Sequence, residues 1–438
     1  MRRMDVWIDR WRLVLLTCGV AAGLATTQSC TGSDGASRTI KIGFVTPLTG
    51  PGASFGEVDT FVIEEARRYF DRTGITVAGT KHDVTIVVRD NEQASDAGPE
   101  HAGELMSQAA LDLIRRDGVD LILAAAGGET AISVSNACEA NGVPCITTVV
   151  PWQSWFIGRG GQPDQTSFVW TYHFFWGWMD PIAVYLDMWS QVSTNKVVGG
   201  LWPDDLQGNA LANLDTGIPA VLSMDGFALV DPGRYPEVAT DFAAFIAAYR
   251  AGNAEILTGL PEPPTFVAFW RQARQGGYLP KVATISTRAV LFPATVEALG
   301  DAGTNLSSEV WWSPSHPFSS SLTGQTAHEL AAAYTAATSK QWSQPIGFTH
   351  ALFEVANAAL TRAASLGPAS IVAAISSLQL DTVVGHLDWT NGPVKNVATT
   401  PLVGGQWQKG TSHPFELNIV SNKDHPEIPR TGSMQPMR

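Results

Sequence analysis

Cysteine, charge and long apolar runs are all scarce in this 438-residue sequence. It contains four cysteines, and only 16% of its residues are charged. Beyond the first 25 residues, no run approaches the roughly 18 apolar residues that a membrane-spanning helix requires. The scarcity of cysteine excludes a disulfide-dense scaffold, and the lack of long runs excludes a bundle of spanning helices.

Basic residues are also few. The chain carries 28 Lys and Arg against 41 Asp and Glu, which gives a net charge of −13. Nucleic-acid phosphates would be repelled by this balance, so nucleic acid is not an expected partner. The 45% of hydrophobic residues and the length suffice for two or three domains, each with its own core.

The N-terminus has the pattern of a secretory signal. Four arginines precede an apolar stretch at 13–25, which predicts a signal peptide over residues 1–29. Cys30 then stands where a bacterial lipoprotein is cleaved and acylated, ahead of a polar tether at 30–38. The match to the lipoprotein cleavage pattern is incomplete, because position 27, three residues before Cys30, is Thr where that pattern has an aliphatic residue. We expect an extracytoplasmic protein and favour a lipid anchor at Cys30 over free secretion.

Two of the remaining cysteines lie close together, Cys138 and Cys145 in "NACEANGVPCITT". In an oxidising compartment a disulfide could close this short helix-to-strand loop. Two buried thiols are the alternative. No His or second cysteine pair lies nearby at ligand spacing, so no metal or other cofactor is expected.

Short apolar runs alternate with segments of helical periodicity along most of the chain. Strands are predicted at 40–45, 84–88, 121–126, 144–150, 197–201, 227–230, 255–259 and 281–285. Helices are predicted at 58–70, 102–116, 132–140, 181–192, 239–251, 266–276 and 350–365. This alternation predicts an α/β protein with two doubly wound parallel-sheet lobes. Ligands bind beyond the carboxyl ends of such strands, so the expected site is a cleft between the lobes.

The loops after the predicted strands hold the candidate binding residues. "GGET" at 127–130 offers free backbone N–H groups at a helix start, which suit an anion, although simple capping by Thr130 is the alternative. Five of the fifteen tryptophans fall between positions 152 and 178. Aromatic side chains of this kind either line a small-molecule pocket or pack between lobes.

Three motifs suggest catalysis, and each has a simpler explanation. Ser54 completes a G-x-S-x-G pattern, but it lies nine residues beyond the strand, whereas a hydrolase nucleophile follows its strand at once. His328-Glu329 lacks the second histidine of a zinc protease, because Ala332 occupies its place. Asp204-Asp205 is expected to cap a turn. We therefore do not expect an enzyme.

Several segments resemble the branched-chain amino-acid-binding (Leu/Ile/Val-binding-like) family of ABC transporter substrate-binding proteins. They are "IKIGFVTPLTGPGASFGE", "DLILAAAGGETAISVSNACEANGVPCIT", "AEILTGLPEPPTFVAFWRQARQGGYLPKV" and "LDTVVGHLDW", in matching order over residues 39–410. The resemblance implies a type I periplasmic binding protein, with two lobes joined by three crossing segments that close on a ligand by hinge motion. It implies crossings near 170–174, 284–288 and 387–397. Lobe one is then expected at 39–171 plus 287–390, lobe two at 172–286 plus 391–425, and a tail at 426–438.

The resemblance also implies ligand contacts at Phe55, Gly127, Gly128, Thr130, Thr148, Val149, Trp170, Tyr172, Ser286 and Thr287. The loops themselves add Glu129, Trp152, Trp155, Leu260 and Arg288 as candidates.

The sequence departs from the amino-acid-binding pattern in one respect. A ligand ammonium group in a closed cleft needs a carboxylate partner, and "WTYHFFWGW" has none while "VATISTRAV" offers Arg288. We expect an aromatic or bulky carboxylate that reaches Arg288 or the amides of 127–130, with an amino acid as the other candidate. The predicted protein captures a small solute and delivers it to ABC permease subunits, and it is expected to be a monomer. A ligand-sensing receptor subunit of the same fold is the second reading, and a secreted hydrolase the third.

Overall fold

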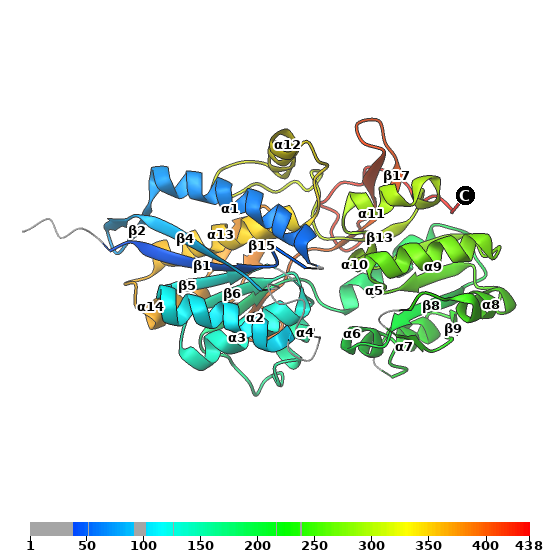
Figure 1. Cartoon of the computed structure of the whole chain (residues 1–438), viewed down its shortest axis with the longest axis horizontal. Helices are drawn as coiled ribbons and strands as arrows, with labels where there is room; N and C mark the ends of the chain where they lie inside the picture. The colour runs from blue at the N-terminus through cyan, green and yellow to red at the C-terminus, as the bar shows by residue number, and fades with distance from the viewer. Residues whose placement is uncertain (1–37, 51, 92–101, 126, 216, 237–238) are drawn as a thin grey trace, which may run out of the picture. The chain divides into compact units, whose positions relative to one another are not determined.

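Two large, mainly parallel sheets, each covered by helices, make up most of the fold (Figure 1). The computed structural model describes residues 38–50, 52–91, 102–125, 127–215, 217–236 and 239–438. The predicted signal peptide and Cys30 lie outside these residues. The α/β fold with two doubly wound lobes is confirmed.

The first sheet has six strands in the order β16-β7-β6-β5-β1-β4, all paired in parallel. Their bounds are β16 (Val397–Ala398), β7 (Thr171–Phe174), β6 (Cys145–Thr148), β5 (Leu121–Ala124), β1 (Ile40–Thr46) and β4 (Val84–Asp90). The central strands β1 and β5 are covered on both faces, which is why their sequences, "IKIGFVT" and "LILA", are nearly continuous apolar runs rather than alternating ones.

Helices cover the first sheet on its two faces. They are α1 (Ala53–Thr73), α2 (Ala102–Asp112), a π-helical turn (Leu113–Asp117), α3 (Gly128–Asn141), α4 (Trp152–Ile157), α12 (Ala327–Thr338), α13 (Pro345–Arg362) and α14 (Pro368–Ser376). Figure 1 shows α1 and α13 on one face and α2 and α3 on the other. Phe44 of β1 stacks on Phe353 of α13, with ring centroids 5.6 Å apart. Gly43 faces the opposite side, where a Cβ would lie 2.9 Å from Leu113.

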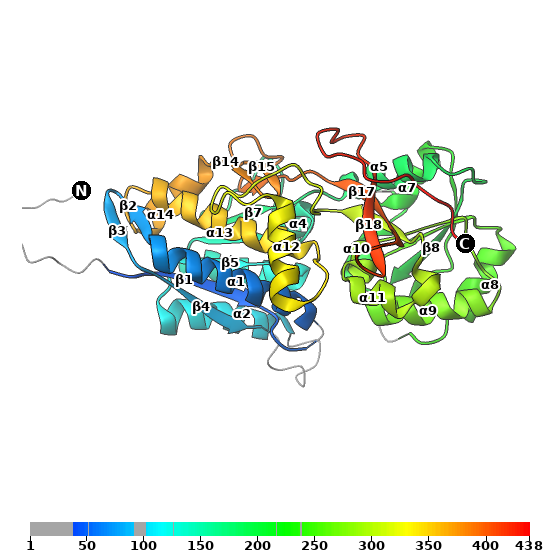
Figure 2. The same cartoon turned by 90° about the horizontal axis from the view of Figure 1, so that it is seen from above.

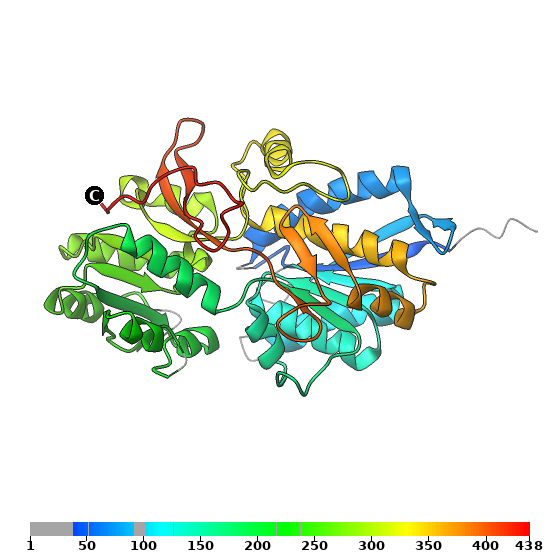
Figure 3. The same ribbon diagram turned by 180° about the vertical axis from the view of Figure 1, so that it is seen from behind.

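Two small hairpins and α12 complete this lobe. The hairpins are β2 (Ile75–Val77) with β3 (Thr80–His82), and β14 (Gln379–Thr382) with β15 (Gly385–Asp388), the latter visible from behind in Figure 3. Helix α12 lies beside α1 (Figure 2), where Tyr334 meets Phe61 edge to face with centroids 5.2 Å apart.

The second sheet has eight strands. Its order is β10-β8-β11-β12-β13-β17-β18, with β9 also paired to β8. The bounds are β8 (Val197–Pro203), β9 (Ala228–Val230), β10 (Arg234–Tyr235), β11 (Ile256–Gly259), β12 (Val282–Ile285), β13 (Ser307–Val310), β17 (Val403–Lys409) and β18 (Phe415–Ser421). The pairing is parallel from β10 to β13, and β17 and β18 then add antiparallel.

Helices cover both faces of this sheet too. They are α5 (Met179–Ser190), α6 (Leu206–Leu211), α7 (Ile218–Met224), α8 (Ala243–Ala251), α9 (Pro263–Gln275), α10 (Thr287–Val290), α11 (Pro293–Ala298) and a 3-10 turn (Gly300–Gly303). Alternate strand residues divide between two cores: Leu201 and Leu257 pack with α8 and α9, whereas Val198 and Ile256 pack with the α5 and α7 side.

The sheets divide the chain at points that differ from the expected lobe boundaries. Residues 172–174 belong to β7 and 397–398 to β16, so the hydrogen-bond ladder keeps both in the first sheet. Residues 307–310 form β13, which pairs with β12 and β17 in the second sheet. The crossing segments are therefore 175–178, the stretch that begins at 311, and 399–402. The C-terminal residues also pack on the second lobe, where the amide of Met437 donates to the carbonyl of Lys281 at 2.8 Å.

Cys138 and Cys145 are free, buried thiols, so of the two alternatives that the sequence left open, the one without a disulfide holds. They lie on α3 and β6, in the apolar layer between α2, α3 and the first sheet. Burial, together with the contact to Cys145, raises the pKa of the Cys138 thiol well above its ordinary value.

We predict that both thiols resist alkylation in the folded protein, because both are buried away from the reagent. Iodoacetamide labelling followed by peptide mass spectrometry should find both positions unmodified at pH 8 and fully modified in denaturant. Rapid labelling of either position without denaturant would contradict this.

Among the described residues, no helix combines the length and apolar character needed to cross a bilayer. The same residues contain no cluster of three or more His, Cys, Asp or Glu side chains arranged to hold a metal ion.

Candidate functional site

The loops at the carboxyl ends of the first sheet are tied to one another by hydrogen bonds. Thr49, after β1, donates to Asp90 at the end of β4 (2.7 Å). Asn91, the next residue, donates through Nδ2 to Thr130 in the first turn of α3 (2.8 Å). The amide of Trp152 donates to the carbonyl of Trp176 (3.1 Å). Parallel strands bring these segments to one edge, and the bonds hold them there as a unit.

The "GGET" segment lies at this edge as predicted. Gly127 caps α3 with φ of +52°, a conformation that glycine adopts without strain. Glu129 is exposed. Thr130 is buried, and its hydroxyl accepts a hydrogen bond from Asn91 instead of capping the helix. Val149, directly after β6, has φ of +67°. A β-branched residue is strained in this region, and such strain concentrates at functional sites.

The first-lobe aromatic candidates do not all reach the carboxyl edge. Trp155 is completely buried, donates to Ser135 (2.8 Å) and stacks on His173. Trp170 precedes β7 and so lies at the opposite, amino end of that strand. Tyr172 points from β7 toward α14, where its hydroxyl donates to the carbonyl of Val372 (3.3 Å).

The other first-lobe candidates lie at the edge. Thr148 is buried and donates to the carbonyl of Phe174 (2.6 Å). Trp152 begins α4 and is half-buried. Phe55 lies in the first turn of α1 and meets Phe292 edge to face, with centroids 5.2 Å apart. Because Phe292 precedes α11 of the second lobe, this contact joins the two lobes.

In the second lobe, three neighbouring strands end in a charged cluster. Asp205 follows β8, Glu262 follows β11 and Arg288 follows β12. The guanidinium of Arg288 forms ion pairs with Asp205 (2.9 Å) and with Glu262. Burial opposes the charge of Arg288, but the two carboxylates outweigh it and the pKa lies above its ordinary value. Arg288 is thus engaged by two acids, where the sequence suggested that it awaited a ligand carboxylate.

The Asp205–Glu262–Arg288 cluster supports a stability prediction. Arg288→Met should lower the free energy of unfolding by about 1 kcal/mol, because two carboxylates would face each other at a half-exposed site. Urea denaturation measures the change. Arg271→Met, on the exposed side of α9, is the matched control, and equal effects of the two substitutions would contradict the prediction.

The remaining second-lobe candidates lie around this cluster. Ser286 caps α10 and donates to Glu309 (3.3 Å), a buried carboxylate that also accepts from the hydroxyl of Tyr185. Thr287 begins α10. Leu260 is buried, and its amide donates to the carbonyl of Leu201 (3.1 Å). Three acids besides Glu129 therefore lie near the predicted site, because Asp205, Glu262 and Glu309 stand at the carboxyl ends of second-lobe strands.

The motifs that suggested catalysis have structural roles. Asp205 caps α6 by accepting from the amide of Gly208 (2.6 Å), which confirms the expected turn. Glu329 forms a capping box with Thr326 at the start of α12. Ser54 is exposed in the first turn of α1.

Some buried polar atoms without a partner, such as Arg159 Nη2 and Tyr278 Oη, lie away from the candidate site, but several belong to residues at the carboxyl ends of strands. Within the described residues, such atoms include Asn91 Oδ1 after β4, Trp176 Nε1 after β7, Trp202 Nε1 at the end of β8, Tyr235 Oη at the end of β10, Trp311 Nε1 after β13 and Thr400 Oγ1 after β16. Each buried polar group without a partner lowers the stability of the fold by about 1–3 kcal/mol. Several such groups at one edge therefore indicate that a bound molecule supplies their hydrogen-bond partners. Of these residues, Trp176 belongs to the tryptophan-rich segment at 152–178, whereas Asn91, Tyr235 and Thr400 carry no signal in the sequence.

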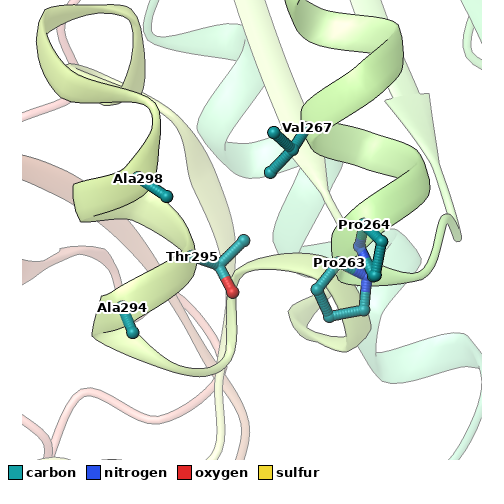
Figure 4. Close-up of a pocket in the computed structure, with 6 residues that line it drawn as sticks. All are labelled: Pro263, Pro264, Val267, Ala294, Thr295 and Ala298. Atoms are coloured by element: carbon teal, nitrogen blue, oxygen red, sulfur yellow. The ribbon is translucent and has the colours of Figure 1, made fainter. Parts of the chain in front are cut away.

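An apolar hollow of about 440 Å³ lies beside the charged cluster, between α9 and α11 (Figure 4). Pro263, Pro264 and Val267 face Ala294, Thr295 and Ala298 across it. Its lining carries no charge that could orient a polar solute, so the candidate site remains at the carboxyl ends of the strands.

The chain has two α/β lobes joined by three crossing segments, and unpaired polar groups lie at the carboxyl ends of both sheets. This arrangement is that of a two-lobed solute-binding protein. Residues 39–412 match the periplasmic binding protein family, and the chain belongs to that family. Membership places the protein outside the cytoplasm. A search of the curated proteins found no match to this chain.

Solved structures of similar fold include several binding proteins. The leucine-binding protein LivK from Thermotoga maritima is 17% identical, with a TM-score of 0.68 over 88% of this chain and 99% of its own. A solute-binding protein of an ABC transporter from Rhodopseudomonas palustris, in complex with p-hydroxybenzoic acid, is 16% identical, with a TM-score of 0.68 over 91% and 98%. LivJ from Streptococcus pneumoniae, in complex with isoleucine, is 13% identical, with a TM-score of 0.65 over 87% and 99%.

Proposed function

We propose that this protein is the solute-binding component of an ABC importer. It captures a small organic solute between its lobes, closes by a hinge motion and presents the closed form to permease subunits in the membrane. The gathering of unpaired buried polar atoms at the carboxyl ends of both sheets carries the proposal, since these are the groups that a bound solute would satisfy. The Phe55–Phe292 contact supports closure, because it already joins one loop of each lobe.

The solute is proposed to be an amino acid or an aromatic or bulky carboxylate. Similar folds have been solved with both kinds of ligand, isoleucine in one case and hydroxybenzoates in others. The proposal includes a lipid anchor at Cys30, a monomeric state and no catalytic activity.

A thermal-shift screen tests the function. A solute present at 100 times its dissociation constant adds about 2.7 kcal/mol to the stability of the folded protein, which raises the melting temperature measurably. We expect a shift from at least one member of a panel of branched-chain amino acids, aromatic acids and neutral bulky solutes. Turnover of an ester substrate that Ser54→Ala abolishes would instead favour a hydrolase.

A further inference from the structure

Two buried tryptophans on the crossing segments have N–H groups without an acceptor. Trp176 lies on the first crossing segment and Trp311 begins the second, and their side chains are 5% and 6% exposed. The Nε1 atoms of both lack a hydrogen-bond partner among the described residues. The Nε2 atom of Gln344, which immediately precedes α13, is also buried and unpaired.

These three side chains belong to one group. The rings of Trp176 and Trp311 are 6.2 Å apart, and Phe175 contacts both of them, at 4.6 Å and 5.1 Å between centroids. Oε1 of Gln344 accepts from the amide of Trp311 (2.6 Å), which places the unpaired amide nitrogen beside the same residue. We call Phe175, Trp176, Trp311 and Gln344 the hinge cluster.

Unpaired indoles are unusual in this protein. Among the residues that the structure describes, six other buried indoles donate to an acceptor: Trp155 to Ser135, Trp189 to Thr284, Trp270 to Ala302, Trp312 to Val383, Trp389 to His173 and Trp407 to Val290. Trp202, at the carboxyl end of β8, is the remaining unpaired case that accompanies Trp176 and Trp311. Trp176 and Trp311 thus follow strands at the candidate site, whereas the indole nitrogen of Trp202 lies beside Gly200, within β8.

The chemistry of the hinge cluster restricts what it can receive. An indole N–H and an amide NH₂ are donors only, so a ligand ammonium, which has no lone pair, cannot satisfy them. A carboxylate has two oxygens that can accept from all three nitrogens, and hydrogen bonds to an ionised acceptor are stronger than those between neutral groups. A single carbonyl oxygen would satisfy fewer of them.

We propose that the hinge cluster is the carboxylate subsite of the solute site. The indole N–H groups of Trp176 and Trp311 and the amide of Gln344 bind the carboxylate of the solute, and Phe175 flanks them. Arg288 does not take this role, because Asp205 and Glu262 already neutralise it. This inference rests on the proposed function. A carboxylate held by Trp176 and Trp311 joins the first crossing segment to the second and thereby couples occupancy to the position of the hinge.

The test deletes the N–H groups while keeping aromatic rings in place. Trp176→Phe and Trp311→Phe are each expected to weaken binding of benzoate, 4-hydroxybenzoate or leucine, whichever binds tightest, by about tenfold in isothermal titration calorimetry. Trp312→Phe is the matched control, since Trp312 is a buried neighbour whose indole already donates to Val383. The control should leave the dissociation constant within about twofold. The wild-type protein should also bind benzoate more tightly than its neutral isostere benzamide.

A second measurement needs no variant. In the wild-type chain labelled with ¹⁵N-tryptophan, two indole N–H proton resonances should move downfield when the carboxylate binds, because two N–H groups gain an ionised acceptor. Unchanged resonances on binding overturn the proposal, as do unchanged affinities in both variants or tighter binding of benzamide. If only solutes without a carboxylate bind, the inference fails and the proposed function stands. If no solute of any class binds, both fail.

Discussion

The free energy of unfolding is expected to fall steeply as the pH is lowered from about 6.5 towards 4. Burial lowers the pKa of His173 to about 3, of His316 to about 3 and of His350 to about 4. In the unfolded chain these side chains take up a proton near pH 6.5, so acid favours the unfolded state. Their contribution is complete above pH 6.5, and each histidine removes about 1.4 kcal/mol per pH unit below it, until its folded pKa is reached.

Two buried carboxyl groups act in the opposite direction. Burial raises the pKa of Asp59 to about 6 and of Glu354 to about 7. Their contribution to stability is complete below their ordinary pKa values and is lost as the pH rises through 6 and 7, so they offset part of the histidine effect. With three histidines against two carboxyl groups, the net effect between pH 6 and 5 remains a loss of stability on acidification.

Urea unfolding at pH 7, 6, 5 and 4.5 measures this profile. The variant His350→Gln should reduce the slope by about the contribution of one histidine, because it removes one of the three titrating groups. The control His328→Gln should leave the slope unchanged, since His328 is exposed on α12. A flat profile, or equal slopes for both variants, would contradict the prediction.

Replacing Glu354 with alanine is expected to lower the free energy of unfolding at pH 7 by about 3 kcal/mol or more. The carboxylate of Glu354 accepts from the amide of Ser321 (2.5 Å), from its hydroxyl (3.0 Å) and from the amide of Val383 (3.1 Å). It thereby fastens the second crossing segment and the β14–β15 turn to α13. Alanine leaves the buried amide of Val383 and the partly buried donors of Ser321 without this acceptor, and an unsatisfied buried donor costs more than the loss of the bond itself.

Equilibrium denaturation tests this expectation against a surface glutamate. Glu65→Ala breaks an exposed ion pair with Arg68 and should change the free energy of unfolding by about 0.5 kcal/mol or less. Glu354→Gln, which keeps one acceptor oxygen, should fall between the two. A loss at Glu354→Ala no larger than at Glu65→Ala would show that the buried hydrogen bonds contribute little.

The strands β1, β4, β5, β6, β8, β9, β11 and β12 could be predicted from sequence because each contains a short apolar run. The parallel strands β10 and β16 are only two residues long and β7, "TYHF", contains no such run, so none of the three was predicted. Strands β13 and β17 could not be predicted either. Their sequences, "SSEV" and "VGGQWQK", contain a buried glutamate and two glycines, and the two strands pair with each other across more than 90 residues of chain. Helix α12 escaped prediction because its alanine-rich sequence gives little amphipathic contrast and its capping box resembled a zinc motif.

The site was predictable to the level of loops and not of side chains. Strand-end loops follow from the order of elements, so 127–130, Val149 and Ser286 lie where the sequence placed them. Which face a side chain takes depends on register, and Trp155 and Tyr172 point into cores rather than to the edge. The pairing of Arg288 with Asp205 and Glu262 depends on the strand order β8-β11-β12, which local sequence does not specify.

The late position of β16, β17 and β18 in the chain has a consequence for biosynthesis. The first sheet lacks its edge strand until residue 398 has been made, and the second lacks two strands until residue 421. A nascent chain of 400 residues would expose the unpaired edge of β13, and an exposed strand edge can pair with other chains and promote aggregation. Neither lobe can therefore complete its folding before the C-terminal strands have been synthesised. Truncation of the last tenth of the chain should impair both lobes.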